Sequence, residues 1–395
     1  MELLISVQRA REILDGEIVP LPPKTMKIQD AASLVLAQAV YAPADVPMFL
    51  QAGMDGYAFA FDPDQARYRI AGEVQAGPEH PMVLPKGTAV RIFTGAPVPE
   101  GADTVLMQEK AVIDDGYLVS NDDQLKQGNN VRPAGSEIRK GELVLEAGSV
   151  LNPVSIGVLA SMGITEVSVY PRPDIAIIVT GNEVQVPGHP LSYGQVYDSS
   201  SSVLTTALSG LHAGQLKVHY VKDKLEAVKN LLDQCLQQAD LVMVTGGVSV
   251  GDHDYTLKAF EACGVRLCFH KIRQKPGKPL LFGLKGHIAV FGLPGNPASV
   301  ITCFYEYVYP ALGKLMHKPM QLKTISLPLA NDYVKPAGIT HFLKARLVHQ
   351  QVQILQGQDS YKLNMLAKAD GFAVIPDTVE QINAGESVEV HLLPK

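Results

Sequence analysis

Short apolar runs typical of buried strands alternate with longer helical segments between Asp174 and Leu312. Because parallel strands need crossover connections of this length, the alternation predicts a doubly wound α/β domain with a parallel sheet. Ligands of such sheets bind beyond the carboxyl ends of the strands, where the glycine-rich turns of this region also lie. The expected strands are 175–180, 217–221, 241–245 and 288–292, and the expected helices are 199–208, 224–238, 255–262 and 298–312.

The rest of the chain has other patterns. Before the α/β region, short strands expected at 68–74, 89–93 and 104–108 are separated by Gly and Pro turns and predict a β-rich insert. After Pro319 only strands are expected. The segments on either side of the insert, which include a helix expected at 28–38, should pair in one discontinuous domain. We therefore expect an α/β multidomain chain that divides into 1–45 with 137–172 (connecting domain), 46–136 (β-rich insert), 173–318 (α/β domain) and 319–395 (C-terminal β-barrel).

The composition of the chain limits the kinds of partner that it is expected to bind. The net charge is −6, and no block of like charge resembles a nucleic-acid arm or a membrane-binding patch, so neither partner is expected. Met1–Arg11 is expected to form a short amphipathic helix rather than a signal peptide, and Pro153 to begin a buried helix rather than a membrane span. The expected location is therefore the cytoplasm. The four cysteines form no C-x-x-C pair, which favours reduced core residues.

The turn Thr245–Asp254 follows an apolar strand and ends in two carboxylates. Backbone N–H groups of such a turn can face a phosphate, and carboxylates beyond them can hold the divalent cation that accompanies it. The spacing matches neither the dinucleotide motif G-x-G-x-x-G nor the P-loop. The aspartates could simply cap the next helix, but Glu183, after the neighbouring strand, favours a shared metal site. The candidates in this turn are Gly246, Gly247, Ser249, Gly251, Asp252 and Asp254.

Two further turns follow. In the first, Lys275 and Lys278 each precede a proline, and four cations collect between 270 and 278 in an otherwise acidic chain. A stiff loop aims two cations at one anion at a lower entropic cost, although both lysines could be ordinary solvated charges. In the second turn, 292–297, the prolines shape either an anion site at the positively polarised N-terminus of the next helix or an ordinary hairpin. Its candidates are Pro294, Gly295, Pro297 and Ser299.

Two patterned segments of the insert, Met54–Ala58 and Arg91–Asp103, complete a set of motifs. M-D-G-Y-A, F-T-G-A-P-x-P-x-G-A-D, T-G-x-E, G-G-V-S-V-G-x-x-D, K-P-G-K-P and G-L-P-G-N-P occur in this order. In these motifs the chain closely resembles, over nearly its whole length, the MoeA family of molybdopterin molybdenumtransferases, which is related to the E domain of gephyrin.

The resemblance implies a homodimer whose cleft lies between the α/β domain of one subunit, which is similar to MogA, and the β insert of the other. It implies insertion of molybdate into adenylated molybdopterin with release of AMP and use of Mg²⁺, and it leaves room for a MogA-like adenylating partner. A cation can neutralise charge on a cleaving anhydride, and lysines can hold molybdate and phosphate oxygens. The residues expected to act are Glu183, Asp198, Asp252 and Asp254 at the metal, Lys275, Lys278 and Ser299 at the oxyanion, and Asp55 and Thr94 from the insert.

The chain departs from the family pattern in places, and two other functions stay open. One is a non-catalytic molybdopterin-binding or scaffold protein. The other is an amidase or nucleotide-binding enzyme that shares only the α/β domain, although the insert motifs count against it. The departures stand at Glu137, Asn182, Ser200, Ile339, Lys344 and Asn364.

Overall fold

The computed structural model describes all residues except 78–79, 212–213, 248–254 and 395. The chain forms two compact units, one made of Met1–Lys24 with Tyr170–Lys395 and the other of Thr25–Val169. Each unit has its own sheets and its own apolar cores. The predicted α/β multidomain fold class is confirmed.

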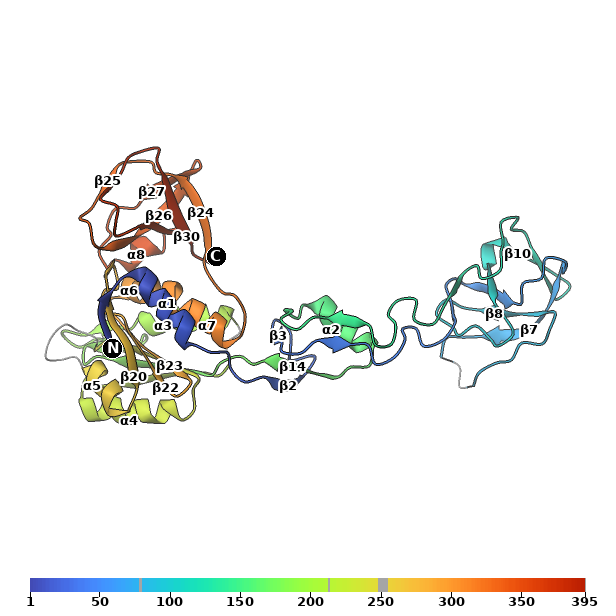
Figure 1. Cartoon of the computed structure of the whole chain (residues 1–395), viewed down its shortest axis with the longest axis horizontal. Helices are drawn as coiled ribbons and strands as arrows, with labels where there is room; N and C mark the ends of the chain where they lie inside the picture. Colours follow the sequence, from blue (N-terminus) through green and yellow to red (C-terminus); the bar gives the residue numbers. More distant parts are fainter. Residues whose placement is uncertain (78–79, 212–213, 248–254, 395) are drawn as a thin grey trace. The chain divides into compact units, whose positions relative to one another are not determined.

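The first unit is built on a seven-stranded sheet with the strand order β1-β20-β22-β23-β19-β15-β18 (Figure 1). The four strands predicted from the alternation are confirmed as β15, β18, β19 and β23, and they pair in parallel. The sheet is nevertheless mixed rather than wholly parallel, because β22 forms an antiparallel hairpin with β23 through Gly286, at φ +60°. The strands are β1 (Glu2–Ile5), β15 (Ile175–Thr180), β18 (Leu216–Val221), β19 (Leu241–Thr245), β20 (Arg266–Ile272), β22 (Leu281–Lys285) and β23 (Ile288–Leu293).

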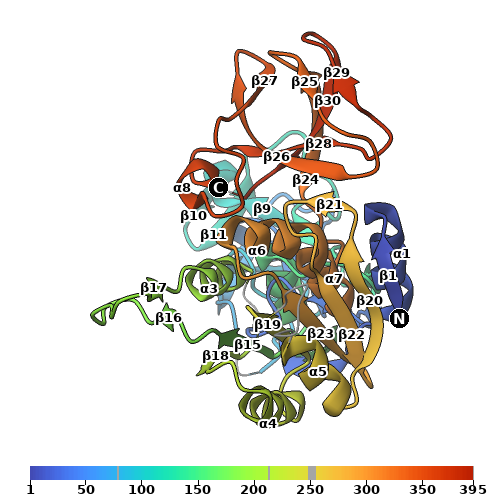
Figure 2. The same ribbon diagram turned by 90° about the vertical axis from the view of Figure 1, so that its left-hand side faces the viewer.

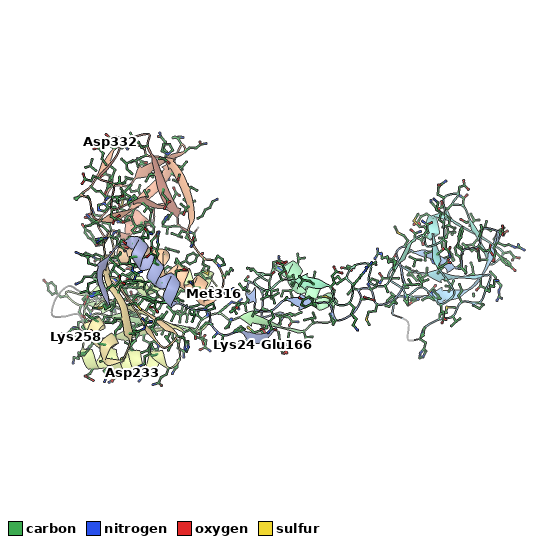
Figure 3. All side chains as sticks on the ribbon, viewed as in Figure 1. Lys24, Glu166, Asp233, Lys258, Met316 and Asp332 are labelled. Atoms are coloured by element: carbon green, nitrogen blue, oxygen red, sulfur yellow. The ribbon has the colours of Figure 1, made fainter. Side chains whose placement is uncertain are left out.

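Helices cover both faces of this sheet, and successive residues of β15 show the division (Figure 2). Ile175 and Ile177 lie in a core with α1, α3, α6 and α7, whereas Ala176 lies in a second core with α4 and α5. This follows from the alternation of side chains along a strand. Asp233 on α4 and Lys258 on α5, labelled in Figure 3, belong to the second layer. The helices are α1 (Val7–Glu17), α3 (Ser200–Gly210), α4 (Leu225–Leu236), α5 (Tyr255–Ala262), α6 (Pro297–Cys303) and α7 (Tyr309–Leu315), with a π-helical turn (Phe304–Val308) before α7.

The N-terminal residues join this unit. β1 pairs in parallel with β20, and α1 begins after Ser6, whose Oγ accepts a hydrogen bond from the Arg9 N–H at 3.1 Å. The helix expected at 1–11 therefore starts late, because the first residues find backbone partners in the sheet. Residues 1–24 belong with the α/β unit and not with the connecting domain expected for 1–45.

In the second unit, segments from both sides of the insert pair with each other. β14 lies between β2 and β3, and β4 pairs with β13. α2 begins after Asn152, whose Oδ1 accepts from the Ser155 N–H at 2.9 Å, in agreement with the helix expected from Pro153. The elements are β2 (Lys24–Lys27), β3 (Val35–Leu36), β4 (Val40–Tyr41), β13 (Leu143–Leu145), α2 (Pro153–Ser161) and β14 (Glu166–Tyr170).

The helix expected at 28–38 is wrong. The backbone of this segment pairs with a distant part of the chain, since the Ser33 N–H donates to the Leu151 carbonyl at 2.7 Å and the Leu36 N–H donates to the Ser149 carbonyl at 2.9 Å. Ser33 has φ +67°, outside the helical region. The apolar side chains of the segment still pack in the core beside α2, so long-range contacts override the local helical spacing.

The insert contains a six-stranded sheet with the order β10-β11-β7-β8-β6-β9. All neighbouring strands are antiparallel except β7 and β8, which are parallel. The strands predicted from the turn-rich pattern are confirmed as β7, β8 and β9. The bounds are β6 (Gly56–Phe59), β7 (Tyr68–Val74), β8 (Thr88–Ile92), β9 (Thr104–Met107), β10 (Ala111–Asp114) and β11 (Tyr117–Ser120).

The C-terminal residues form a further sheet with the order β21-β26-β28-β30-β24, with β27 paired to β26. Its edge strand β21 comes from the α/β part, because Gln274 and Lys275 pair in parallel with Thr340 and His341. The expectation of strands alone after Pro319 is wrong, because a short helix, α8 (Leu363–Leu366), lies between β27 and β28. Across the described residues, no helix combines the length and apolar character needed to cross a membrane. The bounds are β21 (Gln274–Lys275), β24 (Lys323–Pro328), β26 (Thr340–Val348), β27 (Gln351–Ile354), β28 (Gly371–Ile375) and β30 (Ser387–Leu392).

Candidate functional site

The structure brings the ends of β15, β19 and β23 together at the carboxyl edge of the sheet, as predicted. The Gly246 N–H donates to the Leu293 carbonyl at 3.4 Å. Gly295 is so close to Gly246 that an added Cβ would lie 3.9 Å from the Gly246 Cα atom. The turns after β19 and β23 therefore form one surface, and Thr180 at the end of β15 borders it.

Only glycine fits the first positions of the turn after β19. Gly246 has φ +87°, and a Cβ there would lie 2.3 Å from the Thr180 carbonyl oxygen. Gly247 has φ +62°, and its Cβ would lie 2.7 Å from Oγ1 of Thr256. That hydroxyl donates to the Gly246 carbonyl at 3.1 Å, which ties the turn to the start of α5. The other candidates of this turn, Ser249, Gly251, Asp252 and Asp254, lie outside the described residues.

Two carboxylates lie beside this edge. Glu183 is exposed, and both of its carboxylate oxygens lie 3.2 Å from the place of a Cβ on Gly181. Asp223, just beyond β18, accepts a hydrogen bond from the Thr180 hydroxyl and donates its backbone N–H to Oδ1 of Asn182 at 3.3 Å. Asn182, which departs from the family pattern, therefore still makes a polar contact with Asp223 at the end of the neighbouring strand. Glu183 can reach a ligand at this edge.

Asp198 has a different environment. Only 5% of it is exposed, and its Oδ1 accepts from the backbone N–H groups of Ser200 and Ser201 at 2.9 and 3.1 Å. Its Oδ2 accepts from the Ser201 hydroxyl and from the Tyr220 hydroxyl, the latter at 3.1 Å. These four donors hold the carboxylate at the start of α3. The structure therefore gives Asp198 a helix-capping role, whereas the metal role predicted for it is a separate proposal.

Lys275 and Lys278 project from a pinned loop. Both lysines are exposed, while the backbone between them is held, since the Ile272 N–H donates to the Lys278 carbonyl at 2.8 Å. Gly277 is buried at φ +86°, and a Cβ there would lie 2.5 Å from Sγ of Cys303. The side chains of both lysines therefore start from fixed points and end in solvent, where they can meet an anion.

The turn after β23 carries the remaining candidates. Pro294 is buried, Gly295 is exposed, and Pro297 begins α6 with Ser299 in its first turn. Ser299 itself is buried. Gly295 lies next to Gly246, so the predicted grouping of the two turns is present.

A C-terminal loop contacts this turn. Ser360 accepts through its carbonyl from the Ala298 N–H at 3.1 Å and through its hydroxyl from the Asn296 side-chain amide at 2.8 Å. Lys344 holds the same loop, with only 2% of the residue exposed. Burial lowers the pKa of Lys344, and its Nζ donates to the carbonyls of Gly357, Asp359 and Lys362 at 3.1, 2.8 and 3.2 Å. At position 344, where the chain departs from the family pattern, the lysine therefore binds backbone carbonyls of its own chain.

In the insert, Asp55 and Thr94 lie together as predicted. The backbone N–H and the hydroxyl of Thr94 both donate to Oδ1 of Asp55, each at 2.7 Å. These two hydrogen bonds, together with the charge of Arg91, hold the pKa of Asp55 below its usual value. The carboxylate is therefore fixed in direction and ionised, which suits contact with a cation or a ligand hydroxyl.

The sequence did not single out Asp223, Ser360 or Gln274. Asp223 carried one available signal, because it follows a predicted strand as Glu183 does. In the part of the chain that the structure describes, no three His, Cys, Asp or Glu side chains gather as a metal site. A cavity of about 80 Å³ opens at the amino ends of β15 and β18, lined in part by Asp174 and Lys217, away from the predicted residues.

Comparisons with known proteins cover almost the whole chain. Residues 5–163 match the MoeA N-terminal region (domains I and II), residues 176–314 match a probable molybdopterin binding domain, and residues 326–393 match the MoeA C-terminal region (domain IV). A molybdopterin molybdenumtransferase of Haemophilus influenzae is 34% identical, covering 95% of this chain and 97% of the relative.

A second relative, molybdopterin molybdenumtransferase 2 of Mycobacterium tuberculosis, is 31% identical, with 98% of each chain covered. Among solved structures, a molybdopterin biosynthesis MoeA protein from Pyrococcus horikoshii is 30% identical and superposes with a TM-score of 0.82, covering 98% of this chain and 99% of the other.

Proposed function

Because this chain belongs to the MoeA family of molybdopterin molybdenumtransferases, we propose that it inserts molybdate into adenylated molybdopterin and releases AMP. The observation that carries the proposal is that every family region matches in order, with full-length coverage of the relatives. The reaction belongs to the biosynthesis of the molybdenum cofactor, for which the cytoplasm is the proposed location.

The lysine loop suits the binding of molybdate. Two exposed ammonium groups on a pinned loop can share the oxygens of one dianion, and little loop entropy is lost on binding. We assign Lys275 and Lys278 to molybdate and phosphate oxygens. The backbone at Gly246, Gly247 and Gly295 offers close approach to the molybdopterin phosphate.

A divalent cation fits part of the predicted ligand set. Mg²⁺ prefers carboxylate oxygens, and the exposed carboxylate of Glu183 provides them. Asp198 fits less well, because four donors already occupy its oxygens. Asp252 and Asp254 stay proposed ligands on sequence grounds. When bound, Mg²⁺ would neutralise charge on the phosphate anhydride. Glu183 would hold that ion through its carboxylate oxygens.

We further propose that the insert of a second copy completes the cleft. Asp55 and Thr94 form a fixed, ionised contact pair in a different compact unit from the lysine loop. In a homodimer with a shared cleft, mixing an Asp55→Ala variant with a Lys275→Ala variant restores one intact site in each mixed dimer. Random mixing should then recover about a quarter of the wild-type activity. A site built within one subunit would recover nothing.

The direct test is AMP release from adenylated molybdopterin in the presence of molybdate and Mg²⁺. Lys275→Ala and Lys278→Ala should each raise the KM for molybdate, whereas Lys368→Ala, which removes an exposed charge elsewhere, should not. Retained binding of adenylated molybdopterin with no AMP release would favour the scaffold alternative. A MogA-like adenylating partner is the proposed source of the substrate.

A further inference from the structure

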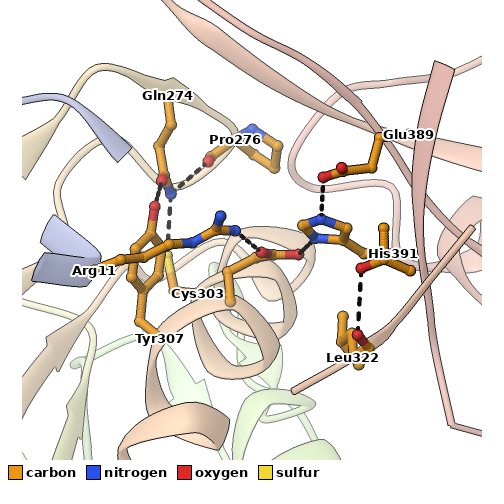
Figure 4. Close-up of polar contacts among 10 residues, drawn as sticks. Arg11, Gln274, Pro276, Cys303, Tyr307, Leu322, Glu389 and His391 are labelled. Carbon is orange, nitrogen blue, oxygen red and sulfur yellow. Dashed lines mark hydrogen bonds and ion pairs between the residues drawn. The ribbon is translucent and has the colours of Figure 1, made fainter. Parts of the chain in front are cut away.

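One buried amide holds the loop that carries both lysines. Gln274 immediately precedes Lys275, and only 2% of it is exposed (Figure 4). Its side-chain NH₂ donates to the Pro276 carbonyl at 3.1 Å and to the Gly277 carbonyl at 3.2 Å. The amide therefore binds the backbone between the two lysines and closes the loop around itself.

The amide is in turn held by the helix that follows β23. Its Oε1 accepts a hydrogen bond from the hydroxyl of Tyr307, which is fully buried. Cys303, one turn earlier, places Sγ 3.7 Å from the Gln274 amide nitrogen and 3.6 Å from the Gly277 carbonyl oxygen. Burial raises the pKa of both the Tyr307 phenol and the Cys303 thiol, so both groups keep their protons and can donate.

The exposed lysines depend on this support for their direction. The side chain of Gln274 can form all of its bonds only when the loop backbone curves toward the helix. The backbone at Gly277 packs closely against the side chain of Gln274, since a Cβ at residue 277 would lie 2.8 Å from the Gln274 amide nitrogen. The loop therefore has little room to move toward the amide. A shift of the amide must therefore shift the attachment points of the lysines.

We propose that Gln274 and Tyr307 are positioning residues that set the spacing of the Lys275 and Lys278 ammonium groups for molybdate. The proposal rests on the proposed function, in which these lysines bind the oxyanion. Both side chains are buried, so in this role they act on the loop and not on the substrate. They fix the loop before substrate arrives, which lowers the cost of aligning two cations on one anion.

The test compares Tyr307→Phe with Tyr305→Phe. Tyr307→Phe keeps the ring and removes only the hydroxyl that bonds Gln274, whereas Tyr305→Phe removes a hydroxyl from the same π-helical turn (Phe304–Val308) at a residue outside this set of contacts. We expect Tyr307→Phe to raise the KM for molybdate about tenfold, with kcat within about twofold and the KM for adenylated molybdopterin unchanged. Tyr305→Phe should match the wild type in all three values.

This pattern separates positioning from simple loss of folded protein, because fewer folded molecules would lower kcat and leave both KM values unchanged. Gln274→Met, which keeps the length but loses every hydrogen bond of the amide, should raise the KM for molybdate further. A KM for molybdate within about twofold of the wild type in both variants would overturn the proposal.

A readout without turnover completes the design. Acetylation of Lys275 and Lys278 by an N-hydroxysuccinimide ester, followed by mass spectrometry, should be suppressed by molybdate, and Tyr307→Phe should need about tenfold more molybdate for the same protection. If wild type shows protection and AMP release but Tyr307→Phe protects equally well, only the positioning inference fails. If the wild type shows neither, the proposed function fails and the inference fails with it.

Discussion

Replacing Glu306 by glutamine should lower the free energy of unfolding of the α/β unit by about 3 kcal/mol. Glu306 is 4% exposed and accepts from Arg11 at 2.6 Å and from Nδ1 of His391 at 2.7 Å. Figure 4 labels Arg11 and His391. Breaking a buried ion pair by removing one partner costs about 3–5 kcal/mol. Glutamine keeps the volume and can still accept one hydrogen bond, which places the expected cost at the low end. The side chain of Arg11 is 44% exposed, so water screens its contact, which we expect to contribute about 1 kcal/mol.

The loss should depend on pH, because His391 carries the charge that Glu306 meets. Burial disfavours the charged imidazole, but the hydrogen bond and charge of Glu306, together with Glu389, outweigh burial and raise the pKa of His391. A raised pKa means that this stabilisation is complete below the unfolded pKa of about 6.5 and is lost as the pH rises through the folded pKa. Glu306→Gln should therefore cost more at pH 6 than at pH 9.

Guanidinium unfolding followed by circular dichroism measures this loss, since the chain has no tryptophan. Arg11→Met is the control and should lose about 1 kcal/mol or less at either pH. An equal cost of Glu306→Gln at pH 6 and pH 9, or a cost as small as that of Arg11→Met, would refute the assignment of the buried pair as the source of the stability.

Three other predictions concern packing at Gly246, Lys344 and His341. Gly246→Ala should cost about 3 kcal/mol in denaturant unfolding, because its Cβ would lie 2.3 Å from the Thr180 carbonyl oxygen, whereas Gly286→Ala, at φ +60° in open space, should cost about 1 kcal/mol. Lys344→Met should leave three carbonyls without their donor, cost about 2 kcal/mol and speed amide hydrogen exchange across 357–362; unchanged exchange would contradict this. Burial, and to a lesser extent the charges of nearby lysines, lowers the pKa of His341 to about 4. Between about pH 6.5 and pH 4 the unfolded chain therefore binds more protons than the folded chain, and the free energy of unfolding should decrease by about 3 kcal/mol as the pH falls through this range. His341→Asn should make the free energy of unfolding less dependent on pH in this range.

Local pattern was enough to predict most elements of the α/β domain. The strand at 175–180 and the helix at 255–262 occur with the predicted bounds. Buried parallel strands are continuous apolar runs, and in the helices between them apolar residues recur about every 3.6 residues. The same reasoning failed at 28–38, where backbone partners come from residues 149–168. It also missed β1 and the antiparallel β22, since pairing direction depends on distant strands.

The candidate site divides in the same way. Turn chemistry marked Gly246 and the lysine loop, because glycines and prolines restrict the local backbone whatever surrounds them. The partners that hold those turns are Gln274, which bonds Tyr307, and Ser360, whose carbonyl accepts from the Ala298 N–H. Their importance comes from where the fold places them beside these backbone groups. The sequence by itself determined the fold class, the family and the turns of the candidate site. Only the tertiary structure decided which side chains fix those turns, because hydrogen bonds between residues far apart in the chain depend on how the elements pack.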